Sequence, residues 1–445
     1  MTALLRRVLI AGVLTGLAAT GPLPAQAKAI ESGAWTAAPN LLDGHVGHTA
    51  TLLNDGRVLI AGGTDVHGVA TSRCELFDPK ANRWIRAGNM IRARAAHAAT
   101  LLADGNVLVS GGQTGLSIFP IQVLSNAEIY HPAINSWTAV AAMHAPRRMH
   151  SSIRLHDGRV LVVGGTNVAP GSPLAAAQQE QAEIYHPQLD RWLIAGTGLA
   201  PLSGEAATLM PDGSVLVTGG SSDSGFATTG AELFDPGTNR WRPTTWPMAT
   251  PRYGHTATLL PDGKVLLVGG YTTQQQQVSG GVIYPVSELL TTSEMFDLRG
   301  NTGIRVGYSI IPRFEHSATL LSNGTVLVVG SAYASDADSQ IFDPKNTEQW
   351  VSTGMPTDRY LHTATVLSDG RVLVAGGFGV GSPPTTWMFS AVPGRSAQSG
   401  YPLVLLAAGL LLALMIAISV VATSGRLARR PAATIRHDDS TWIDS

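Results

Sequence analysis

One phrase of about 16 residues recurs seven times along the chain, and this repeat limits the possible folds more than any other feature. The phrase starts with small residues, usually after a histidine. It passes through an Asp-Gly or Asn-Gly pair, continues as a Val/Leu-rich run and ends in two glycines. The first glycine of each pair, or its equivalent, is at position 62, 111, 164, 219, 269, 330 or 376. Intervals of 46 to 61 residues predict an array of similar supersecondary units.

Each unit has the pattern of four short strands. The small-residue segment and the Val/Leu-rich run flank an Asp-Gly or Asn-Gly turn, which is the strongest short hairpin signal. A third apolar segment contains an aromatic residue, followed in most units by Asp-Pro or His-Pro: residues 74–79, 127–132, 182–187, 231–236, 293–298 and 339–344. The fourth begins at a tryptophan in five units: Trp84, Trp137, Trp192, Trp241 and Trp350. The pattern predicts an all-β, seven-bladed β-propeller with four-stranded blades.

The double glycine, the aromatic residue before Asp-Pro and the later tryptophan resemble the kelch repeat, over roughly Trp35 to Ser390. Unit six departs from the pattern with Gly330-Ser331, unit five lacks the tryptophan, and unit four has Glu205 in place of the histidine. The seventh unit lacks a fourth strand, whereas an unassigned strand-like segment, residues 33–36, precedes the first unit. The resemblance implies that this segment closes the ring by pairing with residues 386–389.

The two ends of the chain have the composition of targeting segments. Residues 1–27 combine Arg6-Arg7, an apolar run and a small-residue site ending at Ala27, the three parts of a secretory signal peptide. An uncleaved anchor is the alternative for this segment. Residues 402–422 contain no charge and are long enough to span a bilayer, and four arginines follow within the last 20 residues. The positive-inside rule then places the C-terminus in the cytoplasm.

We therefore expect five parts: a signal peptide (1–27), a kelch propeller (28–390), a linker (391–401), a transmembrane helix (402–422) and a cytoplasmic tail (423–445). In this arrangement the chain is a single-pass protein of the cell membrane whose propeller is exported.

Charge and cysteine content exclude several function classes. The 30 Lys and Arg residues are balanced by 31 Asp and Glu residues, so no basic surplus exists to neutralise the phosphates of a nucleic acid. The single cysteine, Cys74, excludes an intrachain disulfide and a multi-cysteine zinc site. No nucleophile elbow, P-loop or dinucleotide-binding motif stands in a suitable context, and we expect neither a cofactor nor a resident metal.

One face of the propeller is the expected ligand face. Loops after the first and third strands are tight and uniform, but those after the second strand vary in length: 64–73, 113–126, 166–181 and 271–292. Variable loops on a rigid scaffold commonly carry binding sites. The longest of them contains the polar run Gln274–Gln277, which we interpret as a flexible insertion.

The crossovers between blades lie on the same face and carry a repeated arginine, three residues before the first-strand histidine. Sevenfold geometry would gather these guanidinium groups near one mouth of the central channel, where they suit carboxylates, while neighbouring aromatic rings suit sugars or peptide side chains. His45 and Leu202 replace the arginine in two units. The candidate ligand-binding residues are Arg94, Arg147, Arg252, Tyr253, Arg313, Phe314, Arg359 and Tyr360.

Structural roles are the alternative for the repeated polar residues. The arginines can instead pair with third-strand glutamates such as Glu128, Glu183 and Glu294. The repeated histidines are interpreted as buried hydrogen-bonding residues, because separate blades hold them apart: His48, His97, His150, His255, His316 and His362.

We expect a membrane-tethered, extracellular binding module for a protein or a carbohydrate, without catalytic residues. The alternative is an enzyme that uses the central pocket, either carbohydrate-active or similar to the copper-radical oxidases. Those oxidases need a tyrosine–histidine copper set and a cysteine crosslinked to a tyrosine. Here Tyr130-His131 and Tyr185-His186 stand at the Asp-Pro position of the third strand, and Cys74 takes the place of a packing alanine.

Overall fold

The computed structural model describes residues 33–391, apart from 66, 116–120, 168–180, 197–201, 223–224, 278–282, 300, 309–310, 332–338, 347–348, 356–358 and 380–384. The expected signal peptide, most of the linker, the expected transmembrane helix at 402–422 and the tail lie outside the described residues. Within these ranges, no helix is long and apolar enough to cross a membrane.

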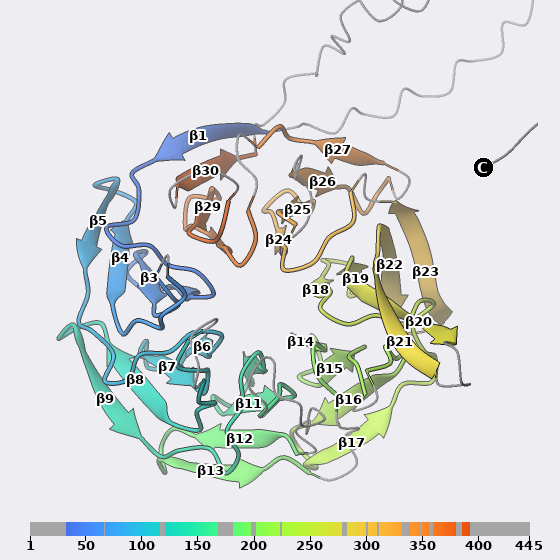
Figure 1. The fold of residues 1–445 in the computed structure, drawn as a ribbon, viewed down its shortest axis with the longest axis horizontal. Coiled ribbons are helices and arrows are strands. Elements are labelled where there is room, and N and C mark those ends of the chain that lie inside the picture. The colour runs from blue at the N-terminus through green and yellow to red at the C-terminus, as the bar shows by residue number, and fades with distance from the viewer. Residues whose placement is uncertain are drawn as a thin grey trace, which may run out of the picture. The chain divides into compact units, whose positions relative to one another are not determined.

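Seven four-stranded antiparallel sheets are arranged as blades around a common axis (Figure 1). The predicted fold class, an all-β propeller with seven four-stranded blades, is confirmed. In each blade the first strand lies nearest the axis and the fourth lies at the rim (Figure 1).

The strand bounds follow the repeat. Blades one to three are β2 (Thr49–Leu52), β3 (Val58–Ala61), β4 (Cys74–Asp78), β5 (Arg83–Arg86); β6 (Ala98–Leu101), β7 (Val107–Ser110), β8 (Ala127–His131), β9 (Ser136–Val140); β10 (Ser151–Arg154), β11 (Val160–Val163), β12 (Glu183–His186), β13 (Arg191–Ile194). Blades four and five are β14 (Ala206–Leu209), β15 (Val215–Thr218), β16 (Ala231–Asp235), β17 (Arg240–Pro243); β18 (Thr256–Leu259), β19 (Val265–Val268), β22 (Thr292–Asp297), β23 (Asn301–Tyr308). Blades six and seven are β24 (Ser317–Leu320), β25 (Val326–Val329), β26 (Gln340–Phe342), β27 (Trp350–Ser352); β28 (Thr363–Val366), β29 (Val372–Ala375), β30 (Thr386–Ser390) and β1 (Ala34–Ala38).

The ring is closed by the N-terminal strand, as predicted. β1 pairs antiparallel with β30, and Trp35 lies opposite Phe389 in the register. The two ring centroids are 5.0 Å apart, and the indole N–H of Trp35 donates to Thr353 Oγ1 of blade six at 3.1 Å. Blade seven therefore combines strands from both ends of the propeller, and β30 is left without an open edge.

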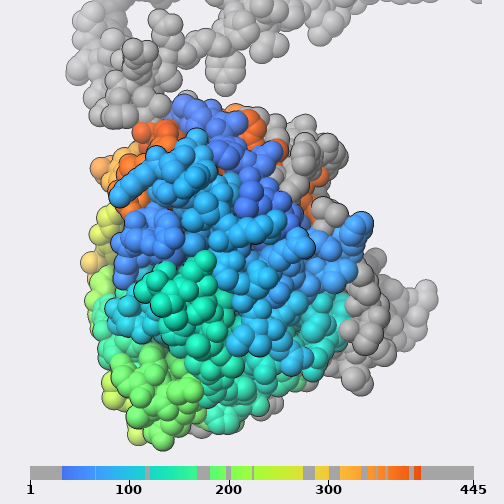
Figure 2. Space-filling model, turned by 90° about the vertical axis from the view of Figure 1, so that its left-hand side faces the viewer, coloured from blue at the N-terminus to red at the C-terminus, as the bar shows by residue number. Residues whose placement is uncertain are grey.

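The second strand of every blade is buried along its whole length. Its Val/Leu-rich run suits this position, because each blade packs against a neighbouring blade on both of its faces. The space-filling view shows adjacent blades in contact along the rim (Figure 2).

Tryptophans of the fourth strands join neighbouring blades. Trp137 packs with Leu59 and Cys74 of blade one, and its indole N–H donates to the Gly88 carbonyl at 2.7 Å. The same bond to the preceding inter-blade segment joins three further pairs: Trp84 to Pro39, Trp192 to Ala141 and Trp241 to Ala195. The tryptophans thus fill gaps between blades, as their spacing predicts.

The long insertion of blade five differs from the expected flexible loop. Residues Tyr271–Gln277 form β20, which pairs antiparallel with β21 (Ile283–Leu289) in a two-stranded sheet beside β22 and β23 (Figure 1). The hairpin is attached to blade four by a bond from the Ala227 N–H to Thr273 Oγ1 at 2.7 Å. The glutamine run therefore belongs to an ordered strand, since cross-strand backbone pairing satisfies a polar sequence as well as an apolar one.

The loops divide between two faces as predicted. Crossover residues pair with residues that follow the second strand, for example Val46 with Thr64 and Tyr253 with Tyr271, so these segments share one face, here called the variable face. The opposite face is formed by the Asp-Gly hairpins and by the turns after the third strands. We call it the uniform face.

Closure can be tested at Trp35. We expect Trp35→Ala to lower the free energy of unfolding by about 2–3 kcal/mol, somewhat less than the cost of a fully buried aromatic truncation, because Trp35 is half-buried. Trp246→Ala is the matched control, since Trp246 is 43% exposed and should change stability by less than about 0.5 kcal/mol. Urea unfolding of the two variants checks this; equal effects would contradict the closing role of β1.

Candidate functional site

The repeated arginines point into the protein, not toward the axis mouth as the sequence-based site requires. Arg94, Arg147, Arg252 and Arg313 have 0% of their surface exposed, and Arg359 has 3%. Every one donates from Nη1 to the carbonyl of the first glycine of its own blade's double glycine, 17 residues later. The guanidinium groups thus hold each crossover to the end of the second strand. We call this arrangement the crossover clasp.

Third-strand glutamates complete the clasp, which is the alternative that the sequence left open. Arg94 Nη2 donates to Glu128 Oε1 at 2.6 Å, and Arg147 Nη2 donates to Glu183 Oε1 at 2.9 Å. Glu128 also accepts the backbone N–H groups of Ile91 and Arg92. Carboxylate and guanidinium therefore satisfy each other and the crossover backbone, which is the condition for burying charges at tolerable cost.

The remaining blades vary the clasp. Arg252 Nε lies 3.4 Å from Glu294 Oε1, and Arg313 Nη2 donates to the Gln340 amide oxygen at 2.8 Å. Arg359 donates to Thr385. Burial lowers the pKa of Arg359 to about 10, so it is still charged at neutral pH. In blade one, both ring nitrogens of His45 take the place of the guanidinium, bonding the Gly62 carbonyl at 2.6 Å and Glu75 at 3.1 Å.

The first-strand histidines form bonds between blades and have the buried structural role expected of them. Each Nε2 bonds a hydroxyl of the preceding blade, as His97 does with Thr49 at 3.0 Å and His48 does with Thr363 at 2.9 Å. Burial lowers the pKa of His150 and of His316 to about 3. These rings are therefore neutral at physiological pH and do not form a cation cluster.

Blade four breaks both patterns. Leu202 stands where other blades have arginine, and Glu205 stands where six blades have histidine. The Glu205 carboxyl lies against Gly164 of blade three, is only 8% exposed, and neither oxygen has a hydrogen-bond partner among the described residues. Burial raises the pKa of Glu205 to about 8, so the group is a neutral acid at pH 7.

Residues just before the histidines form a girdle around the axis. Seven positions have positive φ: Gly47, Ala96, Met149, Gly204, Gly254, Glu315 and Leu361. Backbone N–H groups link several of them from blade to blade, for example Ala96 to the Gly47 carbonyl at 2.9 Å and Leu361 to the Glu315 carbonyl at 3.3 Å. The left-handed conformation is unfavourable for the four non-glycine members, at about 1 kcal/mol or more each. We call these seven residues the axial girdle.

Aromatic side chains gather beside the girdle on the variable face of blades five to seven. Tyr253 stacks on Tyr271 with centroids 5.4 Å apart, and Tyr271 lies 4.6 Å from Phe314. Tyr360 and Phe378 form a second pair at 5.4 Å. All five rings are half-buried. We call them the aromatic crescent.

The structure thus separates the eight candidate ligand residues. It brings Tyr253, Phe314 and Tyr360 together on the variable face and removes the five arginines from solvent. Tyr271 and Phe378 were missed by the sequence analysis, although each directly follows a double glycine. The equivalent pairs in blades one to four are small or polar, as in Val46–Thr64 and Ser203–Ser221, so the crescent occupies one side of the axis.

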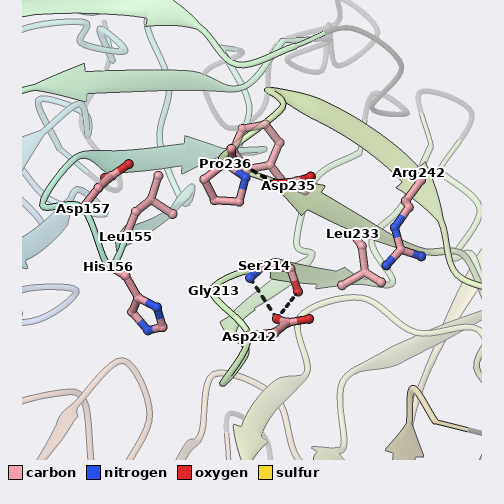
Figure 3. A pocket seen from close by; sticks show the side chains of 12 residues that line it. Leu155, His156, Asp157, Asp212, Gly213, Ser214, Leu233, Asp235, Pro236 and Arg242 are labelled. Carbon is pink, nitrogen blue, oxygen red and sulfur yellow. Dashed lines mark hydrogen bonds between the residues drawn. The ribbon is translucent and has the colours of Figure 1, made fainter.

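A hollow on the uniform face is explained by repeated turns. It encloses about 470 Å³ between blades three and four, with Asp157, Asp212 and Asp235 around it (Figure 3). Asp212 accepts bonds from the backbone N–H and the hydroxyl of Ser214, and Asp157 pairs with Arg159 at 2.6 Å. The same aspartate bond closes the hairpins of other blades, for example at Asp55. These carboxylates stabilise turns and are not aimed at a common ligand position.

The residues required for a copper-radical site do not converge. Cys74 is buried between blades one and two, where burial raises the pKa of its thiol to about 12, and its Sγ lies 3.5 Å from the Ser72 carbonyl. Tyr130 donates to Asn135 at 2.7 Å. In the part of the chain that the structure describes, no three His, Cys, Asp or Glu side chains are grouped to hold a metal. The donor set therefore does not fit copper.

Comparison with known proteins identifies two kelch motifs, at residues 47–91 and 94–144. Kelch-like protein 15 from human is 27% identical over 113 residues, which are 25% of this chain and 18% of that protein, and the mouse and zebrafish proteins match equally well. The match thus spans less than a fifth of these relatives' own length.

Two solved structures share the fold. YjhT is 19% identical with a TM-score of 0.55, covering 71% of this chain and 99% of that one. A fungal alcohol oxidase of the AA5 family in complex with copper is 16% identical with a TM-score of 0.60, covering 81% of this chain and 77% of that one. At these identities the likeness concerns the propeller fold alone.

The clasp can be tested at Arg147. We expect Arg147→Ala to lower the free energy of unfolding by about 3–5 kcal/mol, because Glu183 is left as a buried carboxylate without its guanidinium. Arg371→Ala is the control, since Arg371 pairs with Asp369 at the surface and such pairs are worth about 0–1 kcal/mol. Denaturant unfolding measures both; similar values would contradict the structural role of the clasp.

Glu205 should make stability depend on pH. Between its ordinary value of 4.5 and the native value of about 8, the unfolded chain loses the proton that the native protein retains, so the free energy of unfolding falls as pH rises through this window. The decline should reach a few kcal/mol, at about 1.4 kcal/mol per pKa unit. Glu205→Gln should flatten the profile between pH 5 and 8.

Asp212→Asn is the control for this experiment. Its bonds to Ser214 lower the pKa of Asp212, so its loss cannot flatten an alkaline decline. Thermal melting from pH 5 to 9 compares the three proteins, and an unchanged decline in Glu205→Gln would contradict the assignment.

Proposed function

We propose that this chain is an exported, membrane-tethered kelch propeller that binds a protein or a carbohydrate through the aromatic crescent. The observation that carries the proposal is the concentration of five half-buried aromatic rings on one side of the variable face. Aromatic rings supply large contact area at low entropic cost and stack on sugar rings and on peptide side chains.

The rigidity of its support favours the crescent as a binding site. Tyr253 and Tyr360 directly follow the buried arginines Arg252 and Arg359, so the crossover clasp holds both rings in place before a ligand arrives. The Tyr253 hydroxyl is further held by Ser287 at 2.7 Å. Rings that are already ordered lose little freedom on binding, which favours affinity. The arginines act in this proposal as positioning residues.

The location is inferred from the two ends of the sequence. The signal-like residues 1–27 and the apolar segment 402–422 with its following arginines support an exported propeller and a cytoplasmic tail. Protease added to intact cells should then digest the propeller and spare the tail; a protected propeller would contradict this topology.

Binding by the crescent is tested with the full chain on a glycan array and on an array of synthetic peptides. Once a bound probe is found, Tyr360→Ala and Tyr253→Ala should each weaken its affinity about tenfold, or about 1.4 kcal/mol, with little change in melting temperature. Ile134→Ala is the control, because Ile134 is 71% exposed in a turn of the uniform face. If all three variants bind equally, the crescent is not the binding site.

A further inference from the structure

The charge on the variable face is opposite to the one that the sequence suggests. The five arginines are buried and bonded to carbonyls, glutamates, Gln340 or Thr385, so they present no positive surface to a ligand. Beside the crescent stands an acid instead. Glu315 directly follows Phe314 and directly precedes the buried His316, and it is a member of the axial girdle.

Glu315 lacks the partners that the other repeated carboxylates have. Its side chain is half-buried, and no hydrogen bond or ion pair reaches its carboxylate from the residues that the structure describes. Burial alone raises the pKa of Glu315 to about 7. The group thus loses hydration without gaining a counter-charge, a cost that a bound cation would offset.

Backbone strain at Glu315 adds to this cost. Its φ is 53°, in the left-handed region, where the girdle has glycine in blades one, four and five. A glycine would avoid the penalty of about 1–3 kcal/mol, and a strained residue kept at a surface site is a mark of function.

The surroundings of Glu315 suit an organic cation. Phe314 lies 4.6 Å from Tyr271, and its ring covers the girdle position of blade five, where a Cβ on Gly254 would come within 2.5 Å of it. Tyr360 and Leu361 of blade seven follow, with the Leu361 N–H bonded to the Glu315 carbonyl at 3.3 Å. Aromatic faces attract cations, and they attract arginine more often than lysine.

We infer that the aromatic crescent and Glu315 together form a site for the basic side chain of a partner protein, an arginine or a lysine. This inference rests on the proposed function and specifies its ligand chemistry. The carboxylate binds the charge, and the rings of Phe314 and Tyr360 cover the apolar stem and the guanidinium plane. The one arginine in an equivalent position, Arg148, belongs to blade three and donates to Met149 Sδ at 3.2 Å.

The test compares two short peptides with the full chain by ligand-observed NMR titration, which measures weak binding. The probes are acetyl-glycyl-arginyl-glycinamide and its citrulline counterpart, which has nearly the same shape but no charge. We expect about tenfold tighter binding of the arginine peptide, and a loss of that preference in Glu315→Gln. Glu315→Gly should also lose it while raising the melting temperature, because it relieves the left-handed strain. Asp262→Asn removes one carboxylate from the uniform face and should keep the preference.

Each remaining outcome has a distinct meaning. If both peptides bind equally and Tyr360→Ala weakens both, the cation inference is wrong and crescent binding stands. A glycan that binds through Tyr360 while the arginine peptide does not leads to the same conclusion. If Tyr360→Ala affects neither the peptides nor any array probe, the proposed function fails, and the inference fails with it.

Discussion

The buried arginine at the end of each crossover is the interaction on which the variable face depends. A crossover must leave the rim of one blade and return to the axis in the next, which exposes backbone groups that no strand satisfies. One guanidinium bonds the carbonyl at the end of the second strand and, in blades two, three and five, the glutamate of the third strand. That glutamate also accepts crossover N–H groups, as Glu128 does from Ile91 and Arg92. The irregular segment is thereby fixed to two regular ones.

The same geometry decides which side chains reach a ligand. In the run Arg252-Tyr253-Gly254-His255, the arginine is buried in the clasp, the tyrosine faces outward, the glycine turns with positive φ, and the histidine is buried between blades. Neighbours in sequence thus have opposite environments. The positive φ in the girdle reverses the chain direction, and the clasp prevents the arginine from turning outward.

Departures from the repeat mark the places where this propeller is specialised. Blade four loses the clasp arginine and replaces the inter-blade histidine with Glu205, which leaves an acid without a hydrogen-bond partner between two blades. Blades five to seven place aromatic rings where blades one to four have small or polar residues, and blade six has an acid in the girdle. A symmetric scaffold presents the same surface seven times, so recognition of one ligand must come from such local differences.

The sequence by itself determined the number of blades, the four strands in each, the closing pair of Trp35 with the last strand, and the inter-blade role of the tryptophans. These features follow from local rules, because turn residues, strand periodicity and the repeat length act over a few residues or recur at a constant spacing. They also let the two faces be distinguished before any coordinates.

The direction of the repeated arginines, the strand in the glutamine-rich insertion and the position of Glu315 were decided only by the tertiary structure. A guanidinium beside an aromatic residue has the same local sequence whether it faces a ligand or a glutamate 34 residues later, as Arg94 faces Glu128. Which partner it takes depends on the packing of the third strand against the crossover, and that packing forms only when the blade is complete. Tyr271 and Phe378 likewise meet Tyr253 and Tyr360 only because each second-strand end folds back beside a crossover. The binding surface therefore depends on contacts across the blade that no local pattern encodes.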